Sequence, residues 1–316
     1  MAKKIINTTQ ISREKWLEYR RKGIGGSDAA TIIGLNPYKS RLELYAEKLG
    51  FMSEKEDTEA MRTGRDLEAY VAQRFTEATG KKVRRNNFMW KHDEHSFMIA
   101  DVDREIVGEN SGLECKTTSV WNKSDFGNGE IPLTYYVQCM HYMATMGYDR
   151  MYLAILILGK GFFWFTIERN DEEIAALIES EKAYWNDHIL KGLPPSPDGS
   201  ESSDAATKAL TVSGKELYND DLVLLYDYSK VLEELKEITE HIDRLSNRAE
   251  SIKQSIKMVL KDSTNGSDDK FSVTYKPQSR TVVDSEKLRA LYPEIYRICC
   301  KTTHSRVLRI KEKKEI

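Results

Sequence analysis

An apolar seam with helical spacing marks the last third of this 316-residue chain. Its residues are separated alternately by four and three positions for about five heptads, which favours one long helix. Three partners could cover such a seam: the helix's own domain, a second helix of the same chain in a hairpin, or another chain in a coiled coil. The seam consists of Leu224, Tyr228, Val231, Leu235, Ile238, Ile242, Leu245, Ala249, Ile252, Ile256 and Val259.

The composition changes just before the seam. The stretch GLPPSPDGSESSDAAT, which begins at Gly192, is rich in Pro, Gly and Ser and predicts a linker. We therefore expect a first domain over 1–192, a linker over 193–212, and a helical heptad module over 213–316. Within that module, FSVTYK and RVLRIK predict strands around a helix at 285–291, a small α+β tail.

The first 192 residues mix helical and strand patterns, which predicts an α/β fold, with an α+β mixed sheet flanked by helices. In MYLAILILGKGFFWFTIER, two apolar strands are joined by Gly159-Lys160-Gly161, a hairpin signal. The other expected elements are three short helices in 7–50, a helix over 62–80, strands in 82–104 and 111–119, a helix over 132–147, and a helix capped by Asn170 or Asp171.

The net charge of -2 excludes a chain that binds polyanions through its overall charge. Any contact with nucleic acid must come from a local patch, for which Lys81, Lys82, Arg84 and Arg85 are candidates, although a solvated surface explains them equally well. The four cysteines show no disulfide spacing, and the start of the chain has no apolar signal region. We expect a reduced, intracellular setting without a membrane span.

The segment SGLECKTTS carries the strongest chemical signal. In a strand, Glu114 and Lys116 point to one face, and Leu113 and Cys115 point to the other, toward a core. A carboxylate beside an ammonium on an exposed strip suits a Mg²⁺ ion and an attacking water. A surface ion pair is the ordinary alternative.

Neighbouring carboxylates strengthen this signal. Asp103 lies eleven residues before Glu114, the right distance for a hairpin partner, but Asp101 would share its face in a strand. Glu68 flanks the apolar face of the 62–80 helix. In YYVQCMHYM, Gln138, His141 and Tyr142 share one helical face, and His141 is expected to be a satisfied or exposed histidine rather than a metal ligand.

A glycine-rich loop, GIGGSDAATIIGLNPYKS, precedes a short helix near the N-terminus. Gly23, Gly25 and Gly26 suit a tight turn, and Ser27 is a good N-cap residue. Such a loop can also hold phosphate, but Asp28 would repel it unless its carboxylate turns away or caps the helix.

These motifs, in this order, resemble the YqaJ-type viral recombinase family, which is similar to the phage lambda exonuclease and belongs to the PD-(D/E)xK nuclease superfamily. The resemblance rests on RRKGIGGSDAATIIGLNPYKS, GRDLE, ADVD, LECK and YYVQCMHYM, although Val102 replaces the usual proline. It implies catalytic roles for Glu68, Asp103, Glu114, Lys116 and Gln138. It also implies a Mg²⁺ site made by Asp103, Glu114 and the Cys115 backbone carbonyl, with Glu68 acting directly or through water. Arg20 and Ser27 would grip a DNA 5′-phosphate, with Arg21 competing for the arginine role.

The resemblance further implies a Mg²⁺-dependent 5′–3′ exonuclease on linear double-stranded DNA, with Mn²⁺ able to substitute. Such enzymes serve phage recombination in the bacterial cytoplasm, act with a single-strand annealing protein, and form trimeric rings. Three alternatives remain open: an endonuclease or nickase on the same fold, a catalytically inactive DNA-end-binding protein, and an iron–sulfur nuclease. The cysteine positions disfavour the last, so no iron–sulfur cluster is expected.

Overall fold

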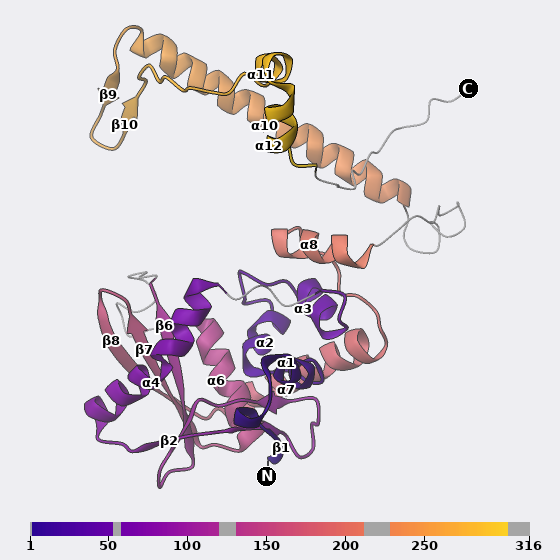
Figure 1. Ribbon diagram of the computed structural model, residues 1–316, viewed down its shortest axis with the longest axis vertical. Coiled ribbons are helices and arrows are strands. Elements are labelled where there is room, and N and C mark those ends of the chain that lie inside the picture. The colour runs from indigo at the N-terminus through magenta and orange to yellow at the C-terminus, as the bar shows by residue number, and fades with distance from the viewer. Residues whose placement is uncertain (1, 53–57, 120–130, 212–227, 303–316) are drawn as a thin grey trace. The chain divides into compact units, whose positions relative to one another are not determined.

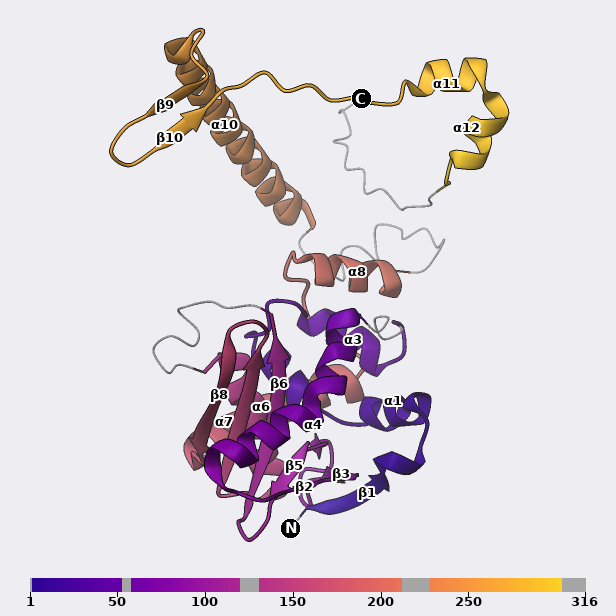
Figure 2. The same cartoon turned by 60° about the vertical axis from the view of Figure 1, so that its left-hand side comes forward.

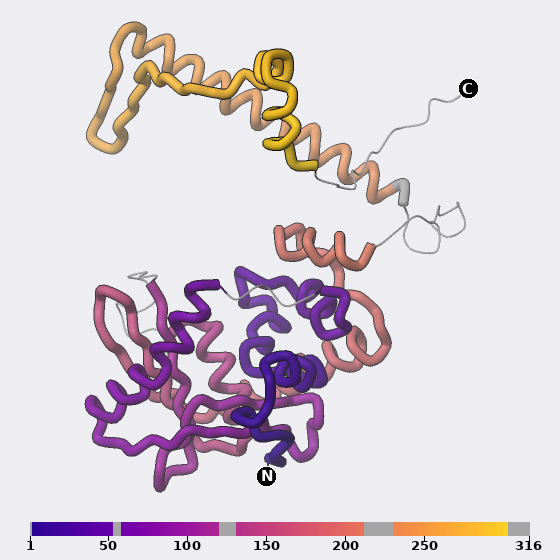
Figure 3. The backbone as a smooth tube through the Cα atoms, viewed as in Figure 1, coloured from indigo at the N-terminus to yellow at the C-terminus, as the bar shows by residue number. Residues whose placement is uncertain are grey.

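The computed structural model describes residues 2–52, 58–119, 131–211 and 228–302. Contacts divide the chain into two units, Met1–Gly214 and Lys215–Ile316. Figure 3 traces the backbone of both units. The predicted seam residue Leu224 and the predicted strand RVLRIK lie outside the described residues.

Five described strands of the first unit form its main sheet, in the order β2-β5-β6-β7-β8 (Figures 1 and 2). β5 and β6 are antiparallel, β6 and β7 are parallel, and β7 and β8 form the predicted antiparallel hairpin. The expected mixed sheet is therefore confirmed. The strands are β2 (Val83–Arg85), β5 (Arg104–Ile106), β6 (Ser111–Thr118), β7 (Arg150–Ile157) and β8 (Gly161–Glu168).

Helices cover both faces of this sheet. On one face, Phe75 of α4 (Glu59–Thr79) packs with Leu113 and Tyr152. On the other face, Met143 of α6 (Leu133–Met146) packs in the same cluster as Leu153, together with residues of α7 (Asp171–Tyr184). Burial on both sides explains why β7 is an unbroken apolar run rather than an alternating one.

A smaller sheet with the strand order β1-β3-β4 lies in the same unit. Its strands are β1 (Lys3–Asn7), β3 (Phe88–Lys91) and β4 (Ile99–Ala100). β1 was not predicted, because a five-residue strand with two lysines carries little apolar signal. The three expected N-terminal helices are confirmed as α1 (Arg13–Arg21), α2 (Gly26–Ile32) and α3 (Arg41–Lys48), and Gly34 and Gly50 adopt positive φ after α2 and α3.

The prediction of a linker is wrong for part of 193–212, because that stretch contains α8 (Glu201–Leu210). Ser200 caps this helix by accepting the Ser203 backbone N–H. Ala206 is fully buried against apolar residues of α3, and the Ser202 hydroxyl accepts the Ser40 backbone N–H at 2.8 Å. The serine-rich composition therefore supplies a helix cap and polar contacts rather than a flexible tether.

The second unit contains the long helix that the seam predicts, α10 (Tyr228–Leu260). It continues into the antiparallel pair β9 (Asn265–Ser267) and β10 (Ser272–Thr274), followed by α11 (Ser285–Leu291) and α12 (Pro293–Cys299). No helix within the described ranges combines the length and apolar character needed to cross a lipid bilayer.

Candidate active site

Glu114 lies in the middle of β6, between β5 and β7. Side chains alternate along the strand as predicted: Leu113 packs with the α4 face, and Glu114 contacts Gln138 of α6. The expectation of an exposed strip is wrong. A helix covers each face of the sheet, and Glu114 is only 4% exposed.

The two oxygens of the Glu114 carboxylate have different surroundings. Oε1 accepts from Lys116 Nζ at 2.7 Å and from Gln138 Nε2 at 2.7 Å. Oε2 is buried and has no hydrogen-bond partner among the described residues. A buried carboxylate oxygen without a hydrogen-bond partner is costly unless a ligand binds it. Lys116 and Gln138 thus fix the carboxylate and leave one oxygen available to a ligand.

Asp103 is the aspartate that joins Glu114. It immediately precedes β5, and the antiparallel pairing of Arg104 with Leu113 brings it to the Glu114 face of the sheet. Its Oδ2 accepts the Cys115 backbone N–H at 2.8 Å. Asp101 instead accepts the indole N–H of Trp16 at 2.8 Å. Both aspartates lie between strands rather than within one, so the tertiary contacts distinguish them where strand alternation could not.

Glu68 of α4 is held beside the site by Arg104, a residue that the sequence analysis did not identify. The buried guanidinium of Arg104 donates to Glu68 Oε1 at 2.5 Å and to the Asp103 carbonyl at 2.7 Å. The available signal was an arginine directly after Asp103, on the same face of a short strand as Ile106. A buried arginine needs an anionic partner.

The carboxylates of this cluster repel one another. Burial raises the pKa of Asp103 well above its ordinary value, and the charges of Glu114 and Glu68 raise it further. Burial also raises the pKa of Glu114, against the opposing effect of Lys116. For Lys116, burial alone would lower the pKa, but Glu114 and Asp103 raise it above its ordinary value. Lys116 is therefore an ammonium at neutral pH and acts as a hydrogen-bond donor.

The donor set fits a hard divalent cation. Asp103 and Glu114 Oε2 offer carboxylate oxygens, the ligands that Mg²⁺ prefers, and Mg²⁺ usually takes few protein ligands and keeps several waters. Among the described residues, no three or more His, Cys, Asp and Glu side chains gather closely enough to form a complete metal cage. In this structure Glu68 pairs with Arg104, which suits its expected contribution through water.

The glycine-rich loop lies beside this cluster. Ile24 forms backbone hydrogen bonds with Phe97 and Ile99, just before the aspartates. Gly25, not Ser27, is the N-cap of α2, so the expected capping role of Ser27 is wrong. Asp28 does the capping, because its carboxylate accepts the Gly25 N–H at 3.1 Å. The Ser27 hydroxyl is therefore not used to cap α2.

The charge of Asp28 is neutralised inside the protein. Its carboxylate lies 2.7 Å from Lys48 Nζ and 3.4 Å from Arg20. Burial alone would raise the pKa of Asp28, but these cations hold it well below its usual range. Burial lowers the pKa of Lys48, and the charge of Asp28 opposes this effect. Lys48 Nζ donates to three acceptors, Asp28 and the carbonyls of Arg20 and Gly23. The repulsion of phosphate expected from Asp28 is therefore offset.

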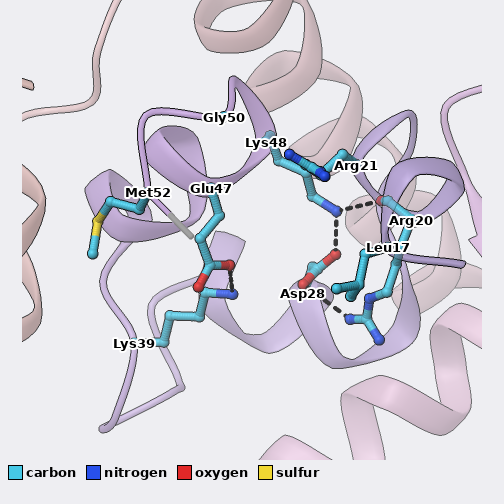
Figure 4. Close-up of a pocket in the computed structure, with 9 residues that line it drawn as sticks. All are labelled: Leu17, Arg20, Arg21, Asp28, Lys39, Glu47, Lys48, Gly50 and Met52. Carbon is cyan, nitrogen blue, oxygen red and sulfur yellow. Dashed lines mark hydrogen bonds and ion pairs between the residues drawn. The ribbon is translucent and has the colours of Figure 1, made fainter. Parts of the chain in front are cut away.

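Arg20 and Ser27 lie together, with the Arg20 guanidinium donating to the Ser27 hydroxyl. Arg20 also borders a pocket of about 330 Å³, shown in Figure 4. Arg21 lines this pocket as well, and Arg20 is the arginine that contacts Ser27. Within the pocket, Lys39 pairs with Glu47.

Tyr142 connects the glycine-rich loop to the carboxylates. Gln138 Nε2, which donates to Glu114, lies 3.2 Å from the Tyr142 hydroxyl, and that hydroxyl donates to the Asp101 carbonyl at 3.1 Å. A Cβ atom added to Gly26 would lie 2.8 Å from the Tyr142 ring and 3.0 Å from Gln138 Cγ. Gly26 is therefore needed for close packing of α2 on α6, beyond any role in the turn.

Of the two expected alternatives for His141, satisfied or exposed, the structure shows the satisfied one. His141 is fully buried, with Nδ1 2.8 Å from Glu181 and Nε2 2.9 Å from the Ile99 carbonyl. Of the basic candidates on the first unit, Lys81 pairs with Glu109, and Arg84 pairs with Glu105 at 2.5 Å.

Comparison with known proteins gives a family match over this region. The model of the YqaJ-like viral recombinase domain matches residues 15–149. The protein YqaJ of Bacillus subtilis (strain 168), itself uncharacterized, is 38% identical over 315 residues, which cover 98% of each chain. Among solved structures, an alkaline exonuclease from Laribacter hongkongensis is 21% identical, with a TM-score of 0.49, over 56% of this chain and 93% of that one. A phage related exonuclease from Haemophilus somnus 129PT is 12% identical, with a TM-score of 0.44, over 56% of this chain and 100% of that one.

Proposed function

Because the chain belongs to the YqaJ-like viral recombinase family, we propose that it is a metal-dependent deoxyribonuclease that digests linear double-stranded DNA. The observation that carries the proposal is the pair of neighbouring carboxylates, half-buried Asp103 and buried Glu114. Glu114 Oε2 has no partner among the described residues, and Lys116 and Gln138 donate to Oε1. Two neighbouring carboxylates beside an ammonium suit a cation and a phosphodiester.

The proposed roles combine the contacts of these residues with the resemblance to the family. Asp103, Glu114 Oε2 and the Cys115 backbone carbonyl would hold Mg²⁺, with Mn²⁺ as a substitute. When bound, such an ion polarises a phosphate and lowers the pKa of a bound water. Lys116 donates hydrogen bonds toward the attacking water and the phosphate oxygens. Gln138 fixes the orientation of Glu114, and Arg104 holds Glu68 beside the site.

The finer expectations belong to the same proposal. Arg20 and Ser27 would bind the 5′-phosphate of a DNA end, so that digestion runs from 5′ to 3′. Their position supports this role, because Gly26 and Tyr142 connect the same loop to Gln138. A single-strand annealing partner, a ring-shaped homotrimer and action in the bacterial cytoplasm would follow from a role in phage recombination.

The decisive experiment compares linear duplexes bearing 5′-phosphate or 5′-hydroxyl ends, with and without Mg²⁺. We expect digestion that requires Mg²⁺ and is faster from the 5′-phosphate. Covalently closed circular DNA should stay intact, and its cleavage would instead establish the endonuclease alternative.

Matched variants separate an active enzyme from a DNA-end-binding protein. Glu114→Gln should abolish digestion, whereas Glu109→Gln, at an exposed position in the same unit, should leave it unchanged. Undiminished digestion by Glu114→Gln would contradict the catalytic role of Glu114. The absence of digestion by the wild-type protein with Mg²⁺ or Mn²⁺ would favour a catalytically inactive DNA-end-binding protein.

A further inference from the structure

The apolar seam of α10 is open to solvent from Val231 to Val259. Its side chains are 40–81% exposed, which is unusual for eight large apolar residues in a single row. The row follows the alternating spacing of a coiled coil rather than the wider stripe of a helix packed on a globular core. Its large apolar members are Val231, Leu235, Ile238, Ile242, Leu245, Ile252, Ile256 and Val259.

The charges of α10 are divided between its two halves. Residues 228–243 contain five acidic and two basic side chains, a net charge of -3. Residues 244–260 contain four basic and one acidic side chain, a net charge of +3. This division suits the dipole of the helix itself, and it also makes the helix complementary to a reversed copy of itself.

We propose that two copies of this chain associate through an antiparallel coiled coil of their α10 helices. The reversed arrangement places the acidic half of each helix along the basic half of the other. The spacing of the seam residues is the same in both directions from the centre of the seam. A single antiparallel register therefore aligns the two helices along their full length. Its layers pair Val231 with Ile256, Leu235 with Ile252, Ile238 with Ala249, and Ile242 with Leu245 of the second copy.

The C-terminal half of the seam has a matching groove. A space of about 420 Å³ opens beside Ile252 and Ile256 and is bordered by Val273 of β10. In the proposed register, Val231 and Leu235 of the second copy lie against this part of the helix. The groove offers space for these side chains beside β10.

Other arrangements are less favourable. A parallel pair would place like-charged halves together and would bring Arg248 of one helix beside Lys253 of the other, at flanking positions. Within the described residues, α11 and α12 have seven residues each, too few to cover a seam that spans four heptads. The proposal does not depend on the nuclease function.

Disulfide trapping in the full-length chain tests the partner and its direction. The background is Cys299→Ser with Cys300→Ser, which removes two exposed thiols. Val231→Cys chains are mixed with Ile256→Cys chains that carry a tag of different mass. We expect mixed disulfide dimers. Homodimers of Val231→Cys would establish a parallel pair, and the absence of cross-linking would show a seam covered within its own chain; either outcome overturns the proposal.

A matched pair on the outer face of α10 controls for random collision. Glu240→Cys and Asn247→Cys lie at the same level of the proposed coiled coil but point away from the seam, so they should not cross-link.

Sedimentation equilibrium gives an independent readout. Ile242→Lys should halve the molar mass of the wild-type assembly, whereas Asn247→Lys should preserve it. An unchanged mass for Ile242→Lys would contradict pairing through the seam.

Discussion

The ammonium of Lys48 on α3 lies 2.7 Å from the carboxylate of Asp28 on α2, and both side chains are at least 95% buried. The same ammonium donates to the carbonyls of Arg20 and Gly23 at 2.9 and 2.6 Å. One lysine thus joins the end of α1, the glycine-rich loop and α2. The position of Arg20 beside Ser27 depends on this junction.

We expect Lys48→Met to destabilise the first unit by about 3–5 kcal/mol, because it leaves the Asp28 carboxylate buried with a weakened counter-charge. Lys22→Met is the matched control, since Lys22 forms an exposed ion pair with Glu18, and exposed pairs contribute little to stability. Urea unfolding followed by tryptophan fluorescence measures both variants. Equal destabilisation by the two changes would show that the buried ion pair contributes no more to the free energy of unfolding than the exposed one.

The close packing of α2 on α6 gives a second prediction. Gly26→Ala introduces a Cβ atom 2.8 Å from the Tyr142 ring, so it must displace the helix that carries Gln138. We expect a destabilisation of about 1–3 kcal/mol and a loss of DNA digestion. Gly64→Ala, where a Cβ atom meets nothing within 4 Å in the α4 helix, should stabilise by about 1 kcal/mol. Similar effects of the two alanines on unfolding and digestion would contradict this account.

These contacts show where sequence reasoning succeeds and where it fails. The strand pattern of SGLECKTTS and its spacing from Asp103 were local signals, and the structure places Glu114 and Asp103 together. The partners Lys48 and Arg104 were missed because they come 20 and 36 residues from Asp28 and Glu68, and no local period encodes such pairs. The helix α8 was read as a linker because its cap residues have loop composition and its support comes from α3.

The buried His141–Glu181 pair predicts a pH dependence of stability. Burial alone would lower the pKa of His141, but Glu181, the Ile99 carbonyl and Asp28 raise it above its ordinary value of 6.5. Burial raises the pKa of Glu181, with His141 and His95 opposing. The folded pair therefore binds protons that the unfolded chain has released. Its stabilisation is fully present below the unfolded pKa of His141 and is lost as the pH rises through the raised folded value.

Thermal unfolding between pH 5.5 and 9 measures this effect. The wild-type melting temperature should fall across the alkaline part of the range, and His141→Gln should reduce that fall. His241→Gln, at an exposed position on α10, should retain the wild-type profile. A profile for His141→Gln that parallels the wild type would assign the pH dependence to other groups.

Tyr142 gives the last prediction, on the proposed active site. Its hydroxyl donates to the Asp101 carbonyl at 3.1 Å and therefore accepts from Gln138 Nε2, which turns the amide donor toward Glu114. Tyr142→Phe removes this constraint with little change of shape. Loss of one buried hydrogen bond costs about 1–2 kcal/mol, so we expect roughly a tenfold fall in the rate of digestion.

Tyr136→Phe on the same helix is the control. Among the described residues, the Tyr136 hydroxyl donates only to Glu173, and this hydrogen bond is exposed to solvent. Tyr136→Phe should leave digestion unchanged. Since Tyr142 positions Gln138 rather than touching DNA, its loss should lower kcat while KM for DNA ends stays constant. In a Gln138→Ala background, Tyr142→Phe should have little further effect, and a full additional tenfold loss there would mean that Tyr142 acts independently of Gln138.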